Sequence, residues 1–167
     1  MIILGFDPGI AIVGFGIIKK EGSLIKPLQY GSIQTKAELD TGTRLKQIYD
    51  ASKEIIETFH PEAVSVEKLF FNRNVTTALT VGQARGVLIL AAVEANLPIF
   101  EYTPLQVKQA IVGYGRAEKK QIQEMVRMYL NIKEVPKPDD VADALAIAIC
   151  HAHSAKLTSL ISRENGK

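Results

Sequence analysis

The chain begins with a short apolar run that ends in a carboxylate and a turn, Met-Ile-Ile-Leu-Gly-Phe-Asp-Pro-Gly (residues 1–9). An apolar run of strand length, bounded by Pro-Gly, is typical of a strand buried on both faces of a sheet. Asp7 would then lie at the end of a central strand, where a carboxylate is costly to bury without a partner. Two interpretations stay open from this stretch alone: Asp7 caps its own turn, or it faces a cation.

The bulk composition indicates one globular domain. A chain of 167 residues with 47% hydrophobic residues is long enough to bury a core. We expect the domain to span residues 1–155 and residues 156–167 to form a flexible polar tail. The apolar blocks are too short to cross a bilayer, and the N-terminus lacks the basic region and cleavage site of a signal peptide. The single cysteine, Cys150, excludes a disulfide framework and a cysteine-rich zinc site, so we expect a cytoplasmic protein without a membrane partner.

Segments of strand and helix periodicity predict a mixed α/β fold. After the first strand we expect strands at 11–20, 24–34, 62–67 and 97–102, and helices at 41–59, 74–96, 104–112, 117–130 and 140–155. The Pro-Gly turn favours a hairpin between the first two strands, and Gly14 and Gly16 leave room on one face of the second. Helix 41–59 implies a parallel crossover that brings strand 62–67 beside an earlier strand. If that strand is the first one, Asp7 and Glu67 lie ~5 Å apart at neighbouring strand ends.

Helix 74–96 is apolar on every side in its second half, Gly-Val-Leu-Ile-Leu-Ala-Ala-Val. A helix of this kind needs cover all round, and in a domain this small the sheet covers only one side. Gly82 and Gly86, one turn apart, permit another helix to approach closely. We therefore predict a symmetric homodimer through helix 74–96.

Charge is distributed unevenly, although the net charge is only +2. Between Tyr102 and Lys137 the chain has seven basic and three acidic residues, and an acidic cluster at 139–143 follows. A solvated helical surface is the ordinary explanation of such a pattern. Lys119 and Lys120, however, fall in the first turn of helix 117–130, where cations oppose the helix dipole. Their placement favours a surface that serves an anionic ligand.

Four carboxylates at the ends of separate elements form the candidate site: Asp7, Glu67, Asp140 and Asp143. Asp139 is explained as the N-cap of the last helix and Asp140 partly by the helix dipole, whereas Asp143 has no such local role. Since Asp140 and Asp143 are three residues apart, both point to one side of the first turn. Ligands that are all oxygen select Mg²⁺ or Mn²⁺, and two such ions suit in-line displacement at phosphorus. The neighbouring basic residues would hold phosphates.

Six phrases of the sequence resemble the RuvC family of Holliday-junction resolvases. They are Ile-Leu-Gly-Phe-Asp-Pro-Gly (3–9), Val-Glu-Lys-Leu-Phe-Phe-Asn-Arg-Asn (66–74), Leu-Thr-Val-Gly-Gln-Ala-Arg-Gly (79–86), Glu-Tyr-Thr-Pro-Leu-Gln-Val-Lys (101–108), Gly-Tyr-Gly-Arg-Ala-Glu-Lys (113–119) and Asp-Asp-Val-Ala-Asp-Ala-Leu-Ala (139–146). They occur in the family's order, and the resemblance covers residues 1 to about 153.

The resemblance implies an RNase H-like α/β fold, with a five-stranded mixed sheet flanked by helices, and a homodimer. It also implies Mg²⁺-dependent nicking of two opposed strands of a four-way DNA junction during recombination and repair, leaving 5′-phosphate and 3′-hydroxyl ends. We expect Mn²⁺ to substitute for Mg²⁺ and two ions to bind each subunit. A branch-migration helicase complex is the implied protein partner.

The resemblance also assigns roles to residues. The family's four acids fall on Asp7, Glu67, Asp140 and Asp143, and some members carry histidine where this chain has Asp140. Two aromatic residues stand in the loop after strand 62–67. The family's base-contacting aromatic falls on Phe70, which leaves Phe71 as the residue that packs on the core. The family's functional lysines fall on Lys108 and Lys119, and we add Arg73, Arg116 and Lys120 as phosphate contacts.

Three other functions would share part of this pattern. An RNase H-like nuclease for RNA or RNA–DNA hybrid would keep the acids but needs neither the dimer helix nor an exposed Phe70. A structural junction-binding protein would be expected to lose at least one acid, and none is lost. An actin-like ATPase also has Asp-Pro-Gly after a strand, but such chains are much longer and have two lobes.

Overall fold

A computed structural model describes residues 1–68 and 75–164. Three residues to which the sequence assigns roles, Phe70, Phe71 and Arg73, lie outside this part of the chain. The elements in chain order are β1 (Ile2–Asp7), β2 (Ile12–Glu21), β3 (Leu24–Gln34), α1 (Thr41–Phe59), β4 (Ala63–Glu67), α2 (Val75–Glu94), β5 (Ile99–Tyr102), α3 (Pro104–Val112), α4 (Lys119–Leu130) and α5 (Asp139–Glu164).

The five strands form one mixed sheet in the order β3-β2-β1-β4-β5. β1 is the central strand: it pairs antiparallel with β2 and parallel with β4, and β4 pairs parallel with β5. The predicted hairpin and the predicted parallel crossover are both confirmed. Residues 3, 4 and 6 of β1 are fully buried, as expected for a strand that is covered on both faces.

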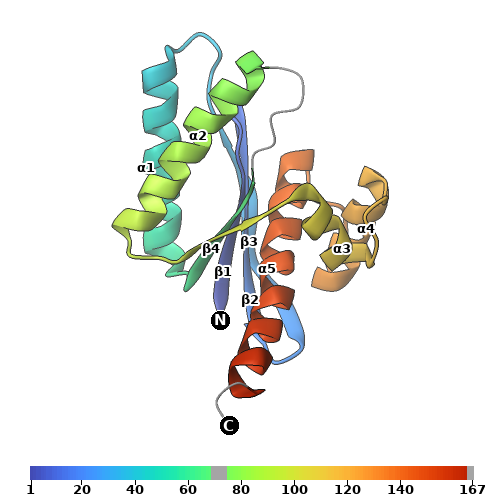
Figure 1. Ribbon diagram of the computed structural model, residues 1–167. Coiled ribbons are helices and arrows are strands. Elements are labelled where there is room, and N and C mark those ends of the chain that lie inside the picture. Colours follow the sequence, from blue (N-terminus) through green and yellow to red (C-terminus); the bar gives the residue numbers. More distant parts are fainter. Residues whose placement is uncertain (69–74, 165–167) are drawn as a thin grey trace.

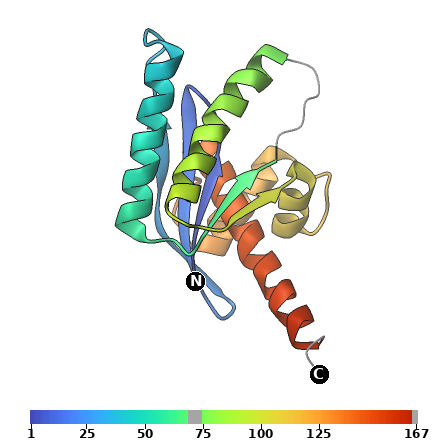
Figure 2. The same cartoon turned by 60° about the vertical axis from the view of Figure 1, so that its left-hand side comes forward.

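Helices cover both faces of the sheet (Figure 1). α1 and α2 lie on one face, and α5, with α3 and α4 beside it, lies on the other. The two cores reflect these layers. Leu4, Phe6 and Val66 face the α1–α2 side, whereas Ile3 and Ile18 pack with the buried stripe of α5. The turned view in Figure 2 shows α1 and α2 side by side and α5 extending past the sheet.

Glycines let α5 approach the sheet closely. A Cβ at Gly14 would overlap the main-chain carbonyl oxygen of Asp140, and one at Gly16 would lie 2.5 Å from a methyl carbon of Leu145. A Cβ at Gly5 would lie 2.9 Å from the Cβ of Ala148. The predicted room beside Gly14 and Gly16 is therefore filled by α5, and the first turn of α5 is fixed against the end of β2.

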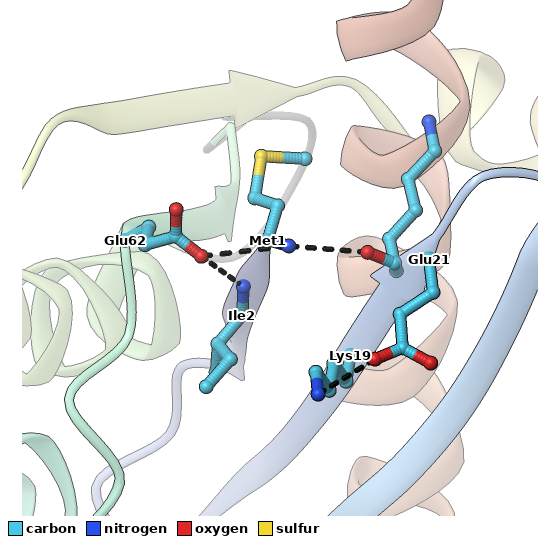
Figure 3. A network of polar contacts seen from close by, with 6 residues as sticks. Met1, Ile2, Lys19, Glu21 and Glu62 are labelled. Atoms are coloured by element: carbon cyan, nitrogen blue, oxygen red, sulfur yellow. Dashed lines mark hydrogen bonds and ion pairs between the residues drawn. The ribbon is translucent and has the colours of Figure 1, made fainter.

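A polar network fixes the start of β1 (Figure 3). The Met1 amino group donates to the Lys20 carbonyl oxygen at 3.1 Å and lies 3.5 Å from a Glu62 carboxylate oxygen. The same carboxylate accepts the Ile2 N–H at 2.7 Å. These bonds join β1 to β2 and to the segment that leads into β4, so they hold the register that brings the other ends of β1 and β4 together.

The ends of α5 differ from the prediction. The expected end at residue 155 is wrong, because the helix continues to Glu164; no proline or glycine occurs before Gly166 to stop it. Asp139 is also not the N-cap, because it is the first helical residue and its side chain accepts a hydrogen bond from Gln123 on α4.

In residues 1–68 and 75–164, none of the helices has the length and apolar character needed to cross a bilayer.

Candidate functional site

Two carboxylates meet at the carboxyl ends of β1 and β4. The parallel ladder pairs Phe6 with Val66, so Asp7 and Glu67 follow as the next residues on neighbouring strands. The predicted neighbourhood of these two strand ends is confirmed. Burial raises the pKa of Asp7 to about 8, and the charges of Asp143, Glu67 and Asp140 add to the effect. The three other carboxylates around Asp7 favour the interpretation that it faces a cation.

The first turn of α5 supplies the other two carboxylates. Since the Asp140 main chain lies against Gly14, and Gly14 pairs with Asp7 across β1 and β2, Asp140 is held beside the end of β1. Asp143 is one turn further on, and its side chain is 34% exposed. Burial raises the pKa of Asp143. Burial also raises the pKa of Glu67, and the negative charge of Asp143 raises it further. The structure thus brings all four predicted acids together.

Lys119, the first residue of α4, carries a positive charge into this acidic cluster. Its amino group lies 3.2 Å from a carboxylate oxygen of Asp143 and 3.2 Å from one of Asp139. Burial alone would lower the pKa of Lys119, but its bonds to Asp139 and Asp143 outweigh burial and raise it. A lysine at the start of a helix opposes the helix dipole, and these two carboxylates offset that cost.

A cleft of about 240 Å³ opens beside the acids. Glu67 and Asp143 line it together with Lys108 of α3 and Lys119, and its other lining residues are apolar. The remaining lining residues are Pro104, Val107, Ile122, Ala146 and Ile147. Arg116 and Lys120 are exposed near the start of α4, outside this set. The cleft therefore brings two carboxylates and two lysines together, and one of the lysines, Lys119, is ion-paired to Asp143.

The donor set fits a hard divalent cation. All four acids present oxygen atoms only, and such ligands favour Mg²⁺ or Mn²⁺ over softer ions. Clustered carboxylates with raised pKa values are relieved by a cation that binds between them. Within the described residues, no three His, Cys, Asp or Glu side chains are already arranged to hold one ion. A cation would have to draw the carboxylates together and compete with Lys119 for Asp143.

One polar residue close to this site, Arg85, was not among the residues predicted from the sequence. Arg85 of α2 donates a hydrogen bond from Nε to the Glu67 main-chain carbonyl oxygen at 3.3 Å, and it forms an ion pair with Glu101 of β5. A signal was present, since Arg85 is the only charged residue of α2 before Glu94. Its partners come from two strands, so periodicity within α2 could not identify them.

Comparisons with known proteins identify the family. The sequence model of the family described as crossover junction endodeoxyribonuclease RuvC matches residues 3–151. The chain belongs to the RuvC family. A RuvC from Brevibacillus brevis, named crossover junction endodeoxyribonuclease, is 66% identical over 160 residues, which are 96% of each chain. One from Clostridioides difficile is 54% identical over 167 residues, 100% of this chain and 99% of the relative.

A solved structure of the RuvC family also matches. Thermus thermophilus RuvC in complex with a Holliday junction substrate superimposes with a TM-score of 0.90 at 40% identity, over 95% of this chain and 96% of that chain. The predicted fold class, an RNase H-like α/β fold with a five-stranded mixed sheet flanked by helices, is confirmed.

Proposed function

We propose that this chain is a metal-dependent endonuclease that resolves four-way DNA junctions by paired nicks. The observation that carries the proposal is the meeting of four carboxylates, from β1, β4 and α5, beside a cleft that Lys108 and Lys119 line. The relatives are named crossover junction endodeoxyribonucleases, and the Thermus protein was solved with a Holliday junction. We propose that the chain acts in the cytoplasm during recombination and repair.

Asp7, Glu67, Asp140 and Asp143 would hold the metal, which we propose to be two Mg²⁺ ions per subunit, with Mn²⁺ as a substitute. Bound ions of this kind lower the pKa of an attacking water and stabilise the charge on the leaving oxygen. The four carboxylates would have to be ionised to hold a cation, so binding of the ion would release any proton that Asp7 keeps in its absence. Cleavage on the 3′-oxygen side of that phosphate would leave 5′-phosphate and 3′-hydroxyl ends.

The lysines of the cleft would bind the phosphate itself. Lys108 and Lys119 line the cleft together with Glu67 and Asp143, so a phosphate that enters it would meet both lysine charges. Lys119 is paired with Asp143 in this structure, and its amino group would pair with the DNA backbone if Asp143 served the cation instead. We propose further contacts from Arg116 and Lys120 to phosphates, from Phe70 to bases at the junction centre, and from Arg73 to a phosphate.

The exposed face of α2 supports a homodimer. Leu79, Leu90 and Val93 of α2 are 63%, 49% and 55% exposed, and a Cβ at Gly86 would meet open space. Exposed apolar side chains along one helix are typical of an interface. Two copies related by a twofold axis would present two sites to a junction that is itself symmetric, which is what paired nicks require. A branch-migration helicase complex is the further partner we propose.

The test is a cleavage assay with synthetic substrates. A mobile four-way junction, a linear duplex and an RNA–DNA hybrid would each be incubated with the protein, in Mg²⁺ and in chelator. Symmetric, metal-dependent nicks in the junction alone are expected, and ligation of the products with DNA ligase would establish the 5′-phosphate and 3′-hydroxyl ends.

Two outcomes would contradict the proposal. Cleavage of the hybrid in preference to the junction would indicate a nuclease of different specificity. Junction binding without any cut, at Mg²⁺ or Mn²⁺ concentrations that saturate the acids, would indicate a structural junction-binding protein. The variant Lys46→Met, which changes an exposed lysine of α1 that pairs with Asp50, is the matched control for loss of a lysine outside the cleft.

A further inference from the structure

Arg85 is a partly buried charge that the proposed chemistry does not use. In the sequence of α2 it is the only charged residue before Glu94, and its side chain is 17% exposed. Because a charge is costly to remove from water without a partner, its position needs specific contacts.

Two contacts of Arg85 with other described residues join three elements. The Arg85 guanidinium pairs with the Glu101 carboxylate of β5, and its Nε–H donates to the main-chain carbonyl oxygen of Glu67, the last residue of β4. Arg85 therefore acts on the main chain of Glu67 and leaves the Glu67 carboxylate available for a cation. The pair with Glu101 holds the guanidinium in place and offsets its charge.

This end of β4 has little other support on the side of β1. The pairing of β4 with β1 runs only as far as Val66. Beyond it, the Lys68 N–H donates to the Tyr102 carbonyl oxygen of β5 at 2.9 Å. The direction of a strand side chain follows from its main-chain orientation. Rotation of the peptide after Glu67 would therefore turn the carboxylate away from Asp7 and Asp143.

We propose that Arg85 is a positioning residue: by binding the Glu67 carbonyl oxygen it fixes the end of β4 with the Glu67 carboxylate toward Asp7 and Asp143. The inference rests on the proposed function, because it assigns Glu67 to the metal. Groups that orient a metal ligand in this way change metal affinity without touching the ion.

Two substitutions of Arg85 test the proposal. Arg85→Lys keeps a charge for Glu101 but has no Nε–H for the Glu67 carbonyl oxygen, whereas Arg85→Met removes both contacts. Mn²⁺ affinity is measured by titration calorimetry on the protein without DNA, and junction affinity is measured in chelator. We expect both variants to bind Mn²⁺ about 10-fold more weakly or worse. Cleavage should need correspondingly more Mn²⁺ and recover in part when Mn²⁺ is raised, with junction affinity unchanged.

Lys53→Met is the matched control. Lys53 of α1 forms an ion pair at 3.5 Å with Glu94, the last residue of α2, at the opposite end of that helix from the acids. It should leave Mn²⁺ affinity as in the wild type. If it weakened Mn²⁺ binding as much as Arg85→Lys does, the effect would belong to α2 as a whole and the positioning role would be refuted.

The outcomes separate this inference from the proposed function. If the wild type cuts the junction and folded Arg85→Lys binds Mn²⁺ and cuts like it, Arg85 has no positioning role and the function stands. A lowered melting temperature with unchanged Mn²⁺ affinity would likewise reduce Arg85 to a structural residue. If the wild type neither binds Mn²⁺ nor cuts, the proposed function itself fails. Should Arg85→Met not fold, Arg85→Lys, which retains the charge, decides the question.

Discussion

Asp7→Asn should stabilise the metal-free protein while it abolishes cleavage. Asp7 lies in a buried position among three other acids. Burial is the larger cause of its raised pKa, and the charges of the three acids raise it further. In the absence of a cation the ionised carboxylate therefore opposes folding, and an amide of the same shape removes that charge. The same change removes a proposed metal ligand and leaves the lysines of the cleft in place, so junction binding should persist.

The size of the effect follows from the pKa of Asp7. The folded-state pKa is about 8 and the ordinary value is 3.8, so the folded protein holds its proton at a pH where the unfolded chain has lost it. Stability is then lost as the pH rises from about 4 to 8, and the loss at pH 7.5 is at most about 5 kcal/mol. A buried amide without full hydrogen bonding costs about 1–3 kcal/mol in return. We expect a net gain of about 2–4 kcal/mol, or about 4–16 °C in melting temperature.

Thermal unfolding in chelator at pH 7.5 and pH 5 provides the assay. The gain should shrink to near zero at pH 5, because most of the cost of ionising Asp7 is absent there. Addition of Mg²⁺ should raise the melting temperature of the wild type and not that of the variant. Asp50→Asn, which breaks an exposed pair with Lys46 on α1, is the control and should change stability by less than about 1 kcal/mol. A variant no more stable than the wild type at pH 7.5 would refute the reasoning.

Three further predictions concern other parts of the fold. Gly14→Ala should destabilise the protein by about 1–3 kcal/mol and reduce cleavage, because its Cβ would overlap the Asp140 carbonyl oxygen and push the first turn of α5 away from the end of β1. Urea unfolding measures the loss of stability and the cleavage assay measures the loss of activity; wild-type activity would contradict this prediction. Burial lowers the pKa of His151 from 6.5 to about 4, helped by the charge of Lys20, so the unfolded chain gains a proton first and stability falls as the pH drops from 6.5 to 4. His151→Phe, compared with the wild type between pH 7 and pH 5, should therefore lose about 2 kcal/mol less, and an unchanged slope would exclude His151 as the cause. Leu90→Glu should give a folded monomer by sedimentation, because Leu90 is 49% exposed on the face of α2 proposed as the dimer interface; a variant that stays dimeric would place the interface elsewhere.

Much of the architecture could be predicted from local patterns. The apolar run before Asp7 predicted a central strand, because a strand that is covered on both faces of the sheet carries apolar residues on both. The helical periodicity of α1 and α3 predicted the same bounds that the structure has. The crossover rule then placed β4 beside β1, so the neighbourhood of Asp7 and Glu67 followed from the sequence. The prediction of the end of α5 failed, because polarity after residue 155 was taken for loss of helix although no helix breaker is present.

The sequence by itself determined which acids stand at element ends, and with them the class of cation they suit, because spacing and residue chemistry are local properties. Only the tertiary structure decided which charges meet. Lys119 reaches Asp139 and Asp143 because α4 packs beside α5, and Arg85 reaches Glu67 because α2 crosses the end of β4. The close approach that brings Asp140 to Asp7 needs Gly14 on a different strand. Such contacts depend on how separate elements pack, and no pattern within one element contains that information.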